Sequence, residues 1–349
     1  DHFFTEEDVK FGKRQGANVI RLPLNYRHFE SDLNPFHYKY TAFERLDQVI
    51  DWCRLHDLYV ILDLHAVQGW QNTDWHSDNA ARQSLFWTNS HYQERFYALW
   101  RTFAQRYAGN PVIAGYDVMN EPLTGVYGTK FRWQPAPDWD IINQVYRKVV
   151  ATIREVDPDH IIFLEGDNFA LRFNGLDAPF ADNLVYVSHN YTTATTGPGE
   201  YPSNNHHRDA LERDFLSHEA TKFTQKHNVP LWIGEFGAYF DGSPAEHDDR
   251  IRATADLIDI FNHYDAHWTT WTYKDVGVMS WVELDPDSLY MQKIAPLHKA
   301  REALDGNFFK FATPQTSFQE CVQTVARRIE QALDDPTLKH SNNTFFLAE

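Results

Sequence analysis

Short apolar segments alternate with longer amphipathic segments along most of this chain, and this alternation constrains the fold more than any other feature. The apolar segments are nearly continuous, which is typical of strands in a parallel sheet that is buried on both faces. The predicted strands cover residues 17–24, 58–65, 112–121, 160–166, 184–190, 229–237 and 267–273. The predicted helices cover residues 41–57, 90–109, 141–158, 208–227 and 247–264.

A repeated strand–helix order of this kind produces either a doubly wound sheet or a (β/α)8 TIM barrel of the α/β class. The first recognisable element is a helix that begins at Thr5, with Thr5 and Asp8 as an N-terminal capping pair. A barrel needs one strand more than the seven predicted here. We therefore expect the first barrel strand to lie before Asp1 or within the unassigned ends of the chain.

No Pro/Gly/Ser-rich tract, low-complexity run or charge block divides the chain, and (β/α)8 barrels commonly reach this length as one domain. We predict a single catalytic domain over residues 1–349, with its core at about 5–300. Residues 306–349 are predicted to form a C-terminal extension. Its amphipathic helix at 317–333 is expected to pack on the outside of the barrel.

Polar side chains close nearly every predicted strand at its C-terminal end. In a barrel these ends converge on one face, where catalytic sites are built, whereas in a doubly wound sheet they spread along a crevice. The strand ends therefore favour the barrel. The residues concerned are Arg21, His65, Asn120 with Glu121, Glu165, His189 with Tyr191, Glu235 and Trp271.

Two of these strand ends carry a glutamate. Glu121 follows the apolar run in "GYDVMNEPL", and Glu235 follows "LWIG". A carboxylate at the end of a buried strand is costly to desolvate, so we expect both to face a shared pocket. Two carboxylates in one pocket are what glycoside hydrolysis requires, because one protonates the leaving oxygen while the other acts at the anomeric carbon.

The ordered set of motifs resembles glycoside hydrolase family 5, a family of retaining (β/α)8-barrel glycosidases. The motifs are "VIRLPL", "LDLHA", "DVMNEP", "SHNY", "IGEFG" and "TWTYK", each at the end of its own strand. The resemblance runs from about Thr5 to about Ala300. It implies that Glu235 is the nucleophile and that Glu121 is the acid/base, with a raised pKa at the start of the cycle.

The same resemblance implies supporting and substrate-binding roles for the other strand-end residues. Arg21 and Tyr191 would hold Glu235 ionised, and Asn120 would bind the sugar 2-hydroxyl. The residues given such roles are Arg21, His65, Asn120, His189, Tyr191 and Trp271. Glu165 is expected to support these residues from behind, and Asp63 to pair within the barrel.

The loops that follow the strands are expected to set specificity. The loop "AVQGWQNTDWHSDN" (66–79) resembles that of family members related to exo-β-1,3-glucanases. Long loops of this kind predict an enclosed pocket, which favours cleavage at the ends of a sugar chain. The candidate loop subsites are Trp70, Gln71, Asn72, Trp75 and Trp281. His76, His206 and His207 have neither an HExxH motif nor a matched acidic partner, so we predict no metal and no other cofactor.

The charge and composition of the chain disfavour several classes of partner. A net charge of −17 disfavours nucleic acids and anionic membrane surfaces and favours a neutral carbohydrate. Cys53 and Cys321 form no CxxC pair, and Cys53 is predicted to be a core thiol. The printed sequence shows neither a signal peptide nor an apolar run of transmembrane length, and it leaves the compartment open.

We therefore expect a retaining β-glycosidase that acts on β-glucosides or short β-glucans, in an exo fashion. An endo-acting β-glucanase (a cellulase) or a β-mannanase with the same chemistry stays open as an alternative. A non-catalytic carbohydrate-binding barrel is a third hypothesis, which the presence of both carboxylates disfavours.

Overall fold

The computed structural model describes residues 3–125, 136–197, 200–240, 244–275, 279–285 and 287–303. The chain divides into two compact units. The first contains Asp1–Tyr273 and Val278–Ser280, and the second contains Lys274–Gly277 and Trp281–Glu349. The predicted extension at 306–349, with its helix at 317–333, lies outside the described residues. The assignment of 1–349 to one catalytic domain stays a prediction.

A sheet of seven parallel strands forms the centre of the described part of the first unit, and neighbouring strands follow each other in chain order. Parallel strands in sequential order confirm the prediction of an α/β fold of the barrel type. Among the described residues, β1 and β9 are the two edges of this sheet. The strands are β1 (Val19–Asn25), β4 (Tyr59–Ala66), β5 (Ile113–Asp117), β6 (Ile161–Glu165), β7 (Leu184–His189), β8 (Leu231–Glu235) and β9 (His267–Trp268).

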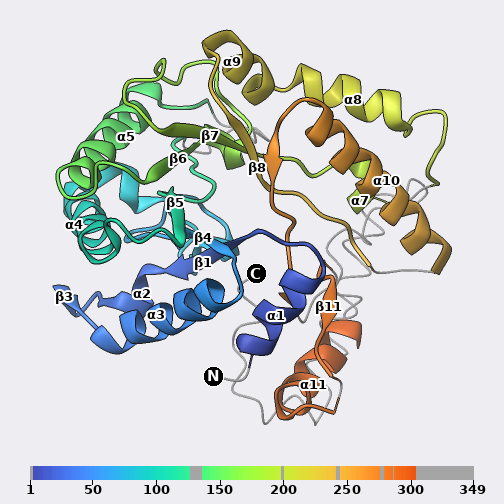
Figure 1. Cartoon of the computed structure of the whole chain (residues 1–349), viewed down its shortest axis with the longest axis horizontal. Helices are drawn as coiled ribbons and strands as arrows, with labels where there is room; N and C mark the ends of the chain where they lie inside the picture. Colours follow the sequence, from blue (N-terminus) through green and yellow to red (C-terminus); the bar gives the residue numbers. More distant parts are fainter. Residues whose placement is uncertain are drawn as a thin grey trace. The chain divides into compact units, whose positions relative to one another are not determined.

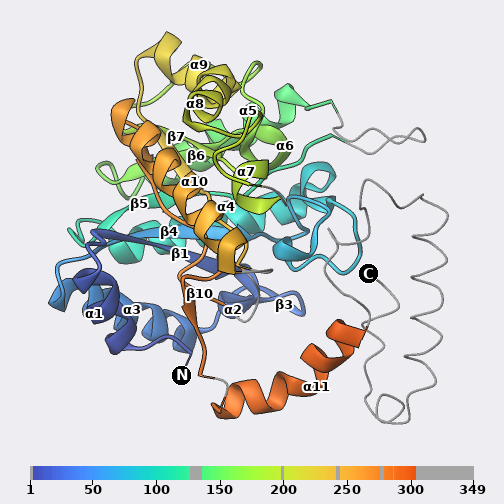
Figure 2. The same ribbon diagram turned by 90° about the vertical axis from the view of Figure 1, so that its right-hand side faces the viewer.

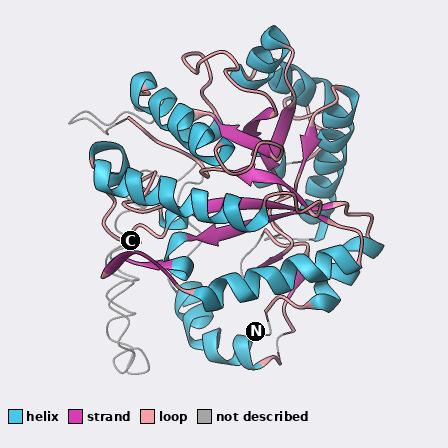
Figure 3. Cartoon of the chain, turned by 60° about the vertical axis from the view of Figure 1, so that its left-hand side comes forward, coloured by secondary structure: helices cyan, strands magenta, loops and turns pink. Residues whose placement is uncertain are grey.

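Helices surround this sheet on the outside (Figure 1), and Figure 3 shows the strands enclosed by them. In Figure 2, the view from the side of α8 and α10, these two helices lie in front of the strands. The helices of the first unit are α1 (Glu6–Arg14), α2 (Tyr26–Phe29), α3 (Tyr40–Leu55), α4 (Ser90–Tyr107), α5 (Trp139–Arg154), α6 (Asp167–Ala170), α7 (Thr193–Thr196), α8 (Arg208–Ser217), α9 (Glu219–His227) and α10 (Pro244–His263), with the 3₁₀ helices η1 (Trp75–Ser77) and η2 (Leu85–Thr88).

Smaller elements complete the described structure. In the first unit, β2 (Glu30–Ser31) and β3 (Asn34–Tyr38) form an antiparallel pair between β1 and α3. The second unit contains β10 (Lys274–Asp275), β11 (Val282–Glu283) and α11 (Leu289–Ala303). None of the described helices combines the length and the apolar character that crossing a bilayer would require.

Local sequence signals explain where several helices begin and end. Helix α1 begins after Thr5, whose backbone N–H donates to Asp8 Oδ2 at 2.7 Å, so the predicted capping pair is confirmed. The predicted helix at 208–227 is wrong as a single element. It is divided into α8 and α9 at His218, where the backbone becomes extended with φ −60° and ψ 142°.

The side chains of the strands alternate between two environments. Outward-facing residues such as Leu62 and Leu64 join the large core that the helices cover, and Cys53 of α3 is buried in that core as predicted. Inward-facing residues form a smaller apolar cluster inside the sheet, made of Ile61, Phe163, Val185, Val187 and Trp232. The guanidinium carbon of Arg21 lies 5.9 Å from the ring of Trp232, so a polar layer begins directly beyond this cluster.

Candidate active site

Arg21, which faces inward from β1, lies at the centre of the polar layer. Its Nη1 donates to Glu235 Oε1 at 2.7 Å, and its Nη2 donates to Asn120 Oδ1 at 2.8 Å. Glu235 is the last residue of β8 and is 5% exposed, whereas Asn120 lies beyond β5 and is fully buried. Because a guanidinium presents its donors in a fixed fork, Arg21 fixes the end of β8 against the end of β5.

Three further carboxylates surround the same guanidinium, and none of them is exposed to solvent. Asp63, Asp117 and Glu165 lie 3.2, 2.9 and 3.1 Å from Arg21. Burial raises the pKa of Asp63 and of Asp117 well above the usual range, because one cation cannot offset this many buried carboxylates. Asp63 and Glu165 thus lie where the sequence placed them, inside the barrel and behind the site.

Asp117 was not among the predicted site residues, although its Oδ2 accepts a 2.9 Å hydrogen bond from Arg21 Nε. A signal was present in the strand register. Asp63 of β4 pairs directly with Asp117 of β5, so the two aspartates occupy equivalent positions on neighbouring strands. Two aspartates at equivalent positions of buried apolar strands indicate a shared cation, and Arg21 on the adjacent strand supplies it.

The backbone of Glu121 is held in a left-handed conformation, with φ +46°. Its N–H donates to Glu165 Oε2 at 2.6 Å, and its carbonyl oxygen accepts a 2.9 Å hydrogen bond from Asn72 Nδ2. A residue with a side chain rarely adopts this conformation, so both backbone groups must be fixed from outside for it to persist. This turn aims the carboxylate of Glu121 away from β5 and toward the end of β7.

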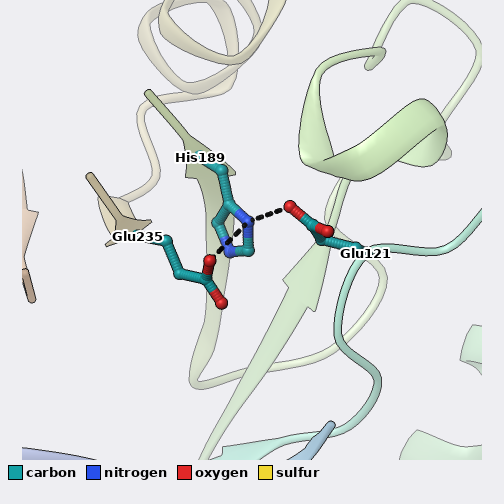
Figure 4. Close-up of side chains that lie close together, drawn as sticks. All are labelled: Glu121, His189 and Glu235. Carbon is teal, nitrogen blue, oxygen red and sulfur yellow. Dashed lines mark hydrogen bonds and ion pairs between the residues drawn. The ribbon is translucent and has the colours of Figure 1, made fainter. Parts of the chain in front are cut away.

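His189, the last residue of β7, lies between the two glutamates (Figure 4). Its Nδ1 lies 2.7 Å from Glu121 Oε1 and 3.7 Å from Glu235 Oε2. One side-chain oxygen or nitrogen from each of Glu121, His189 and Glu235 lies within 4.8 Å of the other two. Spacing alone would allow a cation, but the carboxylates already accept hydrogen bonds from protein donors, and we assign no metal here.

Two histidines set the ionisation of Glu121, through contacts to its two carboxylate oxygens. Burial favours the neutral acid, but the charge of His76 and the hydrogen bond from His189 outweigh it and hold the pKa of Glu121 well below its usual range. The expected raised pKa is therefore wrong for this state of the site. No acidic partner for His76 was expected from the sequence, and the structure supplies one in Glu121.

The pKa values of His189 and Tyr191, which both contact Glu235, are raised. Burial opposes the charge on His189, yet Glu235 and Glu165 raise the pKa of His189 well above its usual range, so its ring is cationic near neutral pH. Burial and the negative charge of Glu235 raise the pKa of Tyr191, so its hydroxyl keeps its proton. That hydroxyl donates to Glu235 Oε2 at 2.9 Å, in the position that the family resemblance implies.

His65, at the end of β4, remains neutral. Burial, together with the charges of Arg21 and His76, lowers the pKa of His65 to about 3. Its Nδ1 donates to Asp63 Oδ2 at 2.7 Å, which leaves Nε2 to accept from Asn120 Nδ2 at 3.3 Å. The ring of His65 also stacks on Trp271, so the residues predicted for one sugar-binding site lie together.

Comparison with known proteins agrees with this geometry. The model of the family Cellulase (glycosyl hydrolase family 5) matches residues 2–277, most of the chain. The chain belongs to glycosyl hydrolase family 5. A β-xylosidase of Phanerodontia chrysosporium is 37% identical over 303 residues, which cover 83% of this chain and 60% of the relative. The chain thus spans about three fifths of the length of that family 5 relative.

A sequence relative and a solved structure at lower identity also match this chain. Endoglucanase C of Acetivibrio thermocellus is 24% identical over 78% of this chain and 85% of its own length. The crystal structure of endoglucanase Cel5A from Thermotoga maritima matches with a TM-score of 0.61 at 20% identity, covering 77% of this chain and 82% of that one. At such identity the structural match establishes the family 5 fold alone.

The loop after β4 contains both buried and exposed members of the predicted subsites. Gln71 and Asn72 have no exposed surface and bind backbone carbonyls, Gln71 those of His65 and Asn120 at 2.7 and 2.8 Å. Their prediction as sugar subsites is therefore wrong, because a fully buried amide that binds the backbone cannot reach a ligand. Their role in this family 5 chain is to join the ends of β4 and β5.

The tryptophans of the predicted subsites differ in exposure. Trp75 is 74% exposed and contacts His76 edge to face, with ring centroids 5.9 Å apart. Trp70 has φ +62° and donates from Nε1 to the carbonyl of Asp78 at 2.8 Å. Trp281 is 41% exposed but belongs to the second unit, so its part in a subsite stays a prediction.

Proposed function

We propose that this chain is a retaining β-glycosidase in which Glu235 attacks the anomeric carbon and Glu121 transfers protons. One observation carries the proposal. An oxygen of Glu121 lies within 4.8 Å of an oxygen of Glu235, on opposite sides of His189. Retaining glycosidases hold their carboxyl groups about 5–5.5 Å apart, and inverting enzymes leave about 6.5–9.5 Å for a water molecule.

The two carboxylates have environments that suit different roles. Glu235 accepts from Arg21 and Tyr191, which hold the anion and aim one oxygen, as a nucleophile requires. The carboxylate of Glu121 is bound, among the described residues, by the rings of His189 and His76, and histidine is a side chain that can exchange protons near neutral pH. In the first step Glu235 forms a glycosyl-enzyme while Glu121 protonates the leaving oxygen. In the second step Glu121 removes a proton from the attacking water.

We propose β-glucosides or short β-glucans, attacked from a chain end, as substrates. The exposed Trp75 in the loop after β4 supports this proposal, because it lies beside His76 and could bind a sugar next to Glu121. A second candidate activity is β-xyloside hydrolysis, which the name of the 37% identical relative favours. The endo-acting alternatives, cellulase and β-mannanase, keep the same two glutamates.

A panel of aryl β-glycosides tests the proposal directly. We expect the β-glucoside or the β-xyloside to be cleaved with retention, so the first-formed sugar is the β-anomer in a proton NMR time course. An α-anomer as first product would overturn the retaining mechanism. No cleavage of any aryl β-glycoside would favour the carbohydrate-binding barrel. Mixed product lengths at early times on a soluble β-glucan would overturn exo action.

A further inference from the structure

His76 lies on η1, the short 3₁₀ helix in the loop after β4, and its ring reaches the carboxylate of Glu121. Its Nε2 lies 2.8 Å from Glu121 Oε2, while His189 contacts the other oxygen. The His76 side chain is about one-fifth exposed, so part of its ring is accessible from solvent. Each oxygen of Glu121 therefore has its own imidazole partner.

The hydrogen bonds of Asn72 bear on the protonation state of His76 Nε2, the atom that contacts Glu121. Its Oδ1 accepts from the N–H of Asp74 and its Nδ2 donates to the carbonyl of Glu121, both at 2.9 Å, so the amide orientation is fixed. The same Nδ2 lies 3.1 Å from His76 Nε2. The Asn72 amide can donate a hydrogen bond to His76 Nε2 only when this nitrogen is unprotonated and has a lone pair. The ionised carboxylate of Glu121 can accept a hydrogen bond from the same nitrogen only when it is protonated. The surroundings thus accommodate Nε2 in both protonation states.

The two histidines differ in the charges that face them. His189 lies within 4 Å of three carboxylates, those of Glu121, Glu165 and Glu235, and stays cationic when Glu121 gains a proton. Among the described residues, His76 has one carboxylate, that of Glu121, within the same distance.

The acidic groups that face His76 are Glu121 in direct contact, Asp74 from its own loop and Glu235 from β8. The ring of His65, from β4, lies 6.2 Å from that of His76 and is neutral. When Glu121 becomes neutral, His76 therefore loses its only ion-pair partner among the described residues.

We propose that His76 is a positioning residue that holds, on Nε2, the proton that Glu121 delivers to the leaving group. The inference rests on the proposed function. In the resting site Nε2 carries the proton and Glu121 is ionised. When the aglycone excludes water, the proton moves from Nε2 to Glu121 Oε2, because two neutral groups tolerate desolvation better than an ion pair. Nε2 then accepts from Asn72.

The proton balance closes over the two chemical steps. The O–H bond of Glu121 breaks as the glycosidic oxygen takes its proton and the bond from that oxygen to the anomeric carbon breaks. Glu121 is then a carboxylate, and in the second step it takes one proton from the water that attacks the glycosyl-enzyme. Return of this proton to His76 Nε2 restores the resting state.

A titration of the histidine rings tests the pairing without relying on turnover. We would label the ring nitrogens, assign His76 by the signal lost in His76→Gln, and follow its pKa by NMR in wild type and in Glu121→Gln. We expect His76 to titrate above 6.5 in wild type and to fall in Glu121→Gln. Equal His76 pKa values in the two proteins would overturn the proposal. The surface residue His91 serves as control and should not change.

Kinetics of His76→Gln separate proton storage from simple structural support. Glutamine can still donate to Glu121 Oε2 but releases no proton. For a β-glycoside with a poor leaving group, kcat/KM should fall by about 10²-fold and the alkaline limb of its pH profile should move to lower pH. The dinitrophenyl glycoside needs no protonation and should change little.

Two outcomes of this comparison contradict the proposal. An equal loss for both leaving groups would assign His76 a structural role, and an unmoved alkaline limb would place the proton elsewhere. His91→Gln, the matched control, should retain the wild-type profile. If wild type cleaves no glycoside at all, the proposed function fails, and the NMR titration still decides whether His76 and Glu121 share a proton.

Discussion

The rings of His65 and Trp271 lie face to face, with centroids 5.1 Å apart and planes inclined by 8°. They are far apart in the chain, because His65 lies at the end of β4, the second strand of the sheet, and Trp271 lies in the segment after β9. Stacking covers one face of a histidine whose Nδ1 already donates to Asp63. This packing contributes to the burial that keeps His65 neutral, and it gives the fold a measurable pH dependence.

The first prediction is that replacing His65 weakens the acid sensitivity of the fold. The pKa of His65 is about 3 in the folded chain, against 6.5 for an ordinary histidine. Between these values the unfolded chain binds a proton that the folded chain excludes, so this residue lowers stability as pH falls from 6.5 toward 3. In His65→Gln the free energy of unfolding should depend less steeply on pH over that window, by the slope that corresponds to one proton per chain. Urea unfolding at several pH values measures the slope, and an unchanged slope would contradict the assignment.

The second prediction separates the two glutamates by leaving group. Glu235→Ala removes the covalent path, so activity should collapse for every glycoside. Glu121→Ala should still form the glycosyl-enzyme from a dinitrophenyl glycoside, because that group leaves without protonation. Breakdown then lacks its base, and the intermediate should accumulate as a burst in stopped-flow absorbance. With poor leaving groups the loss should be about 10²–10⁴-fold.

The third prediction uses azide to read the geometry of each variant. Azide attacks the glycosyl-enzyme of Glu121→Ala without a base and should give a β-glycosyl azide. In Glu235→Ala it fills the space of the lost carboxylate and should give the α-azide instead. NMR of the product reads the anomeric configuration. The reverse pairing of products and variants would mean that the two roles are exchanged.

The fourth prediction concerns the hydroxyl that holds Glu235. Tyr191→Phe removes the 2.9 Å hydrogen bond to Oε2, and hydrogen bonds to charged groups are worth about 1.5–3 kcal/mol. We expect kcat to fall by about 10- to 100-fold with every leaving group. Tyr186→Phe is the matched control, because the buried Tyr186 hydroxyl has no hydrogen-bond partner among the described residues. A similar loss of activity in both variants would argue against a specific role for Tyr191.

The fifth prediction tests Trp75 as a sugar platform. Its ring is 74% exposed, so Trp75→Ala should change the free energy of unfolding by no more than about 0.5 kcal/mol. Loss of an aromatic face should raise KM for an oligosaccharide by about threefold to tenfold. The aryl monosaccharide, which extends less far, should be affected less. Unchanged KM values for both substrates would remove Trp75 from the binding site.

Much of the fold was predictable because burial on both faces leaves a plain apolar signal in the parallel strands. Strand β7 at Leu184–His189 lies within the segment predicted at 184–190. The last strand was overestimated, since 267–273 was predicted and only His267–Trp268 pairs with β8. Beyond Trp268 the chain leaves the ladder, and Trp271 N–H donates to the carbonyl of Phe236. Aromatic residues in this segment resemble strand residues even where they line a site.

The site was predictable only where a strand delivers the residue. Glu121, Glu235 and His189 follow apolar runs, and their convergence follows from parallel strand direction alone. His76 was not predictable in this way, because its position depends on the path of an irregular loop. That path is set by Asn72 and its neighbours, through hydrogen bonds to backbone groups that no periodic pattern encodes.

The left-handed backbone of Glu121 sets stability and activity against each other at a single position. A side chain at φ +46° costs of the order of 1–3 kcal/mol, and glycine would remove this penalty. Glycine at position 121 would also remove the proton-transfer group. A search for heat-resistant variants that scored folding alone would thus be drawn to this position and would recover proteins that no longer turn over. Directed evolution of this chain therefore needs an activity screen at every round, because a substitution at position 121 can raise thermal stability while it abolishes catalytic activity.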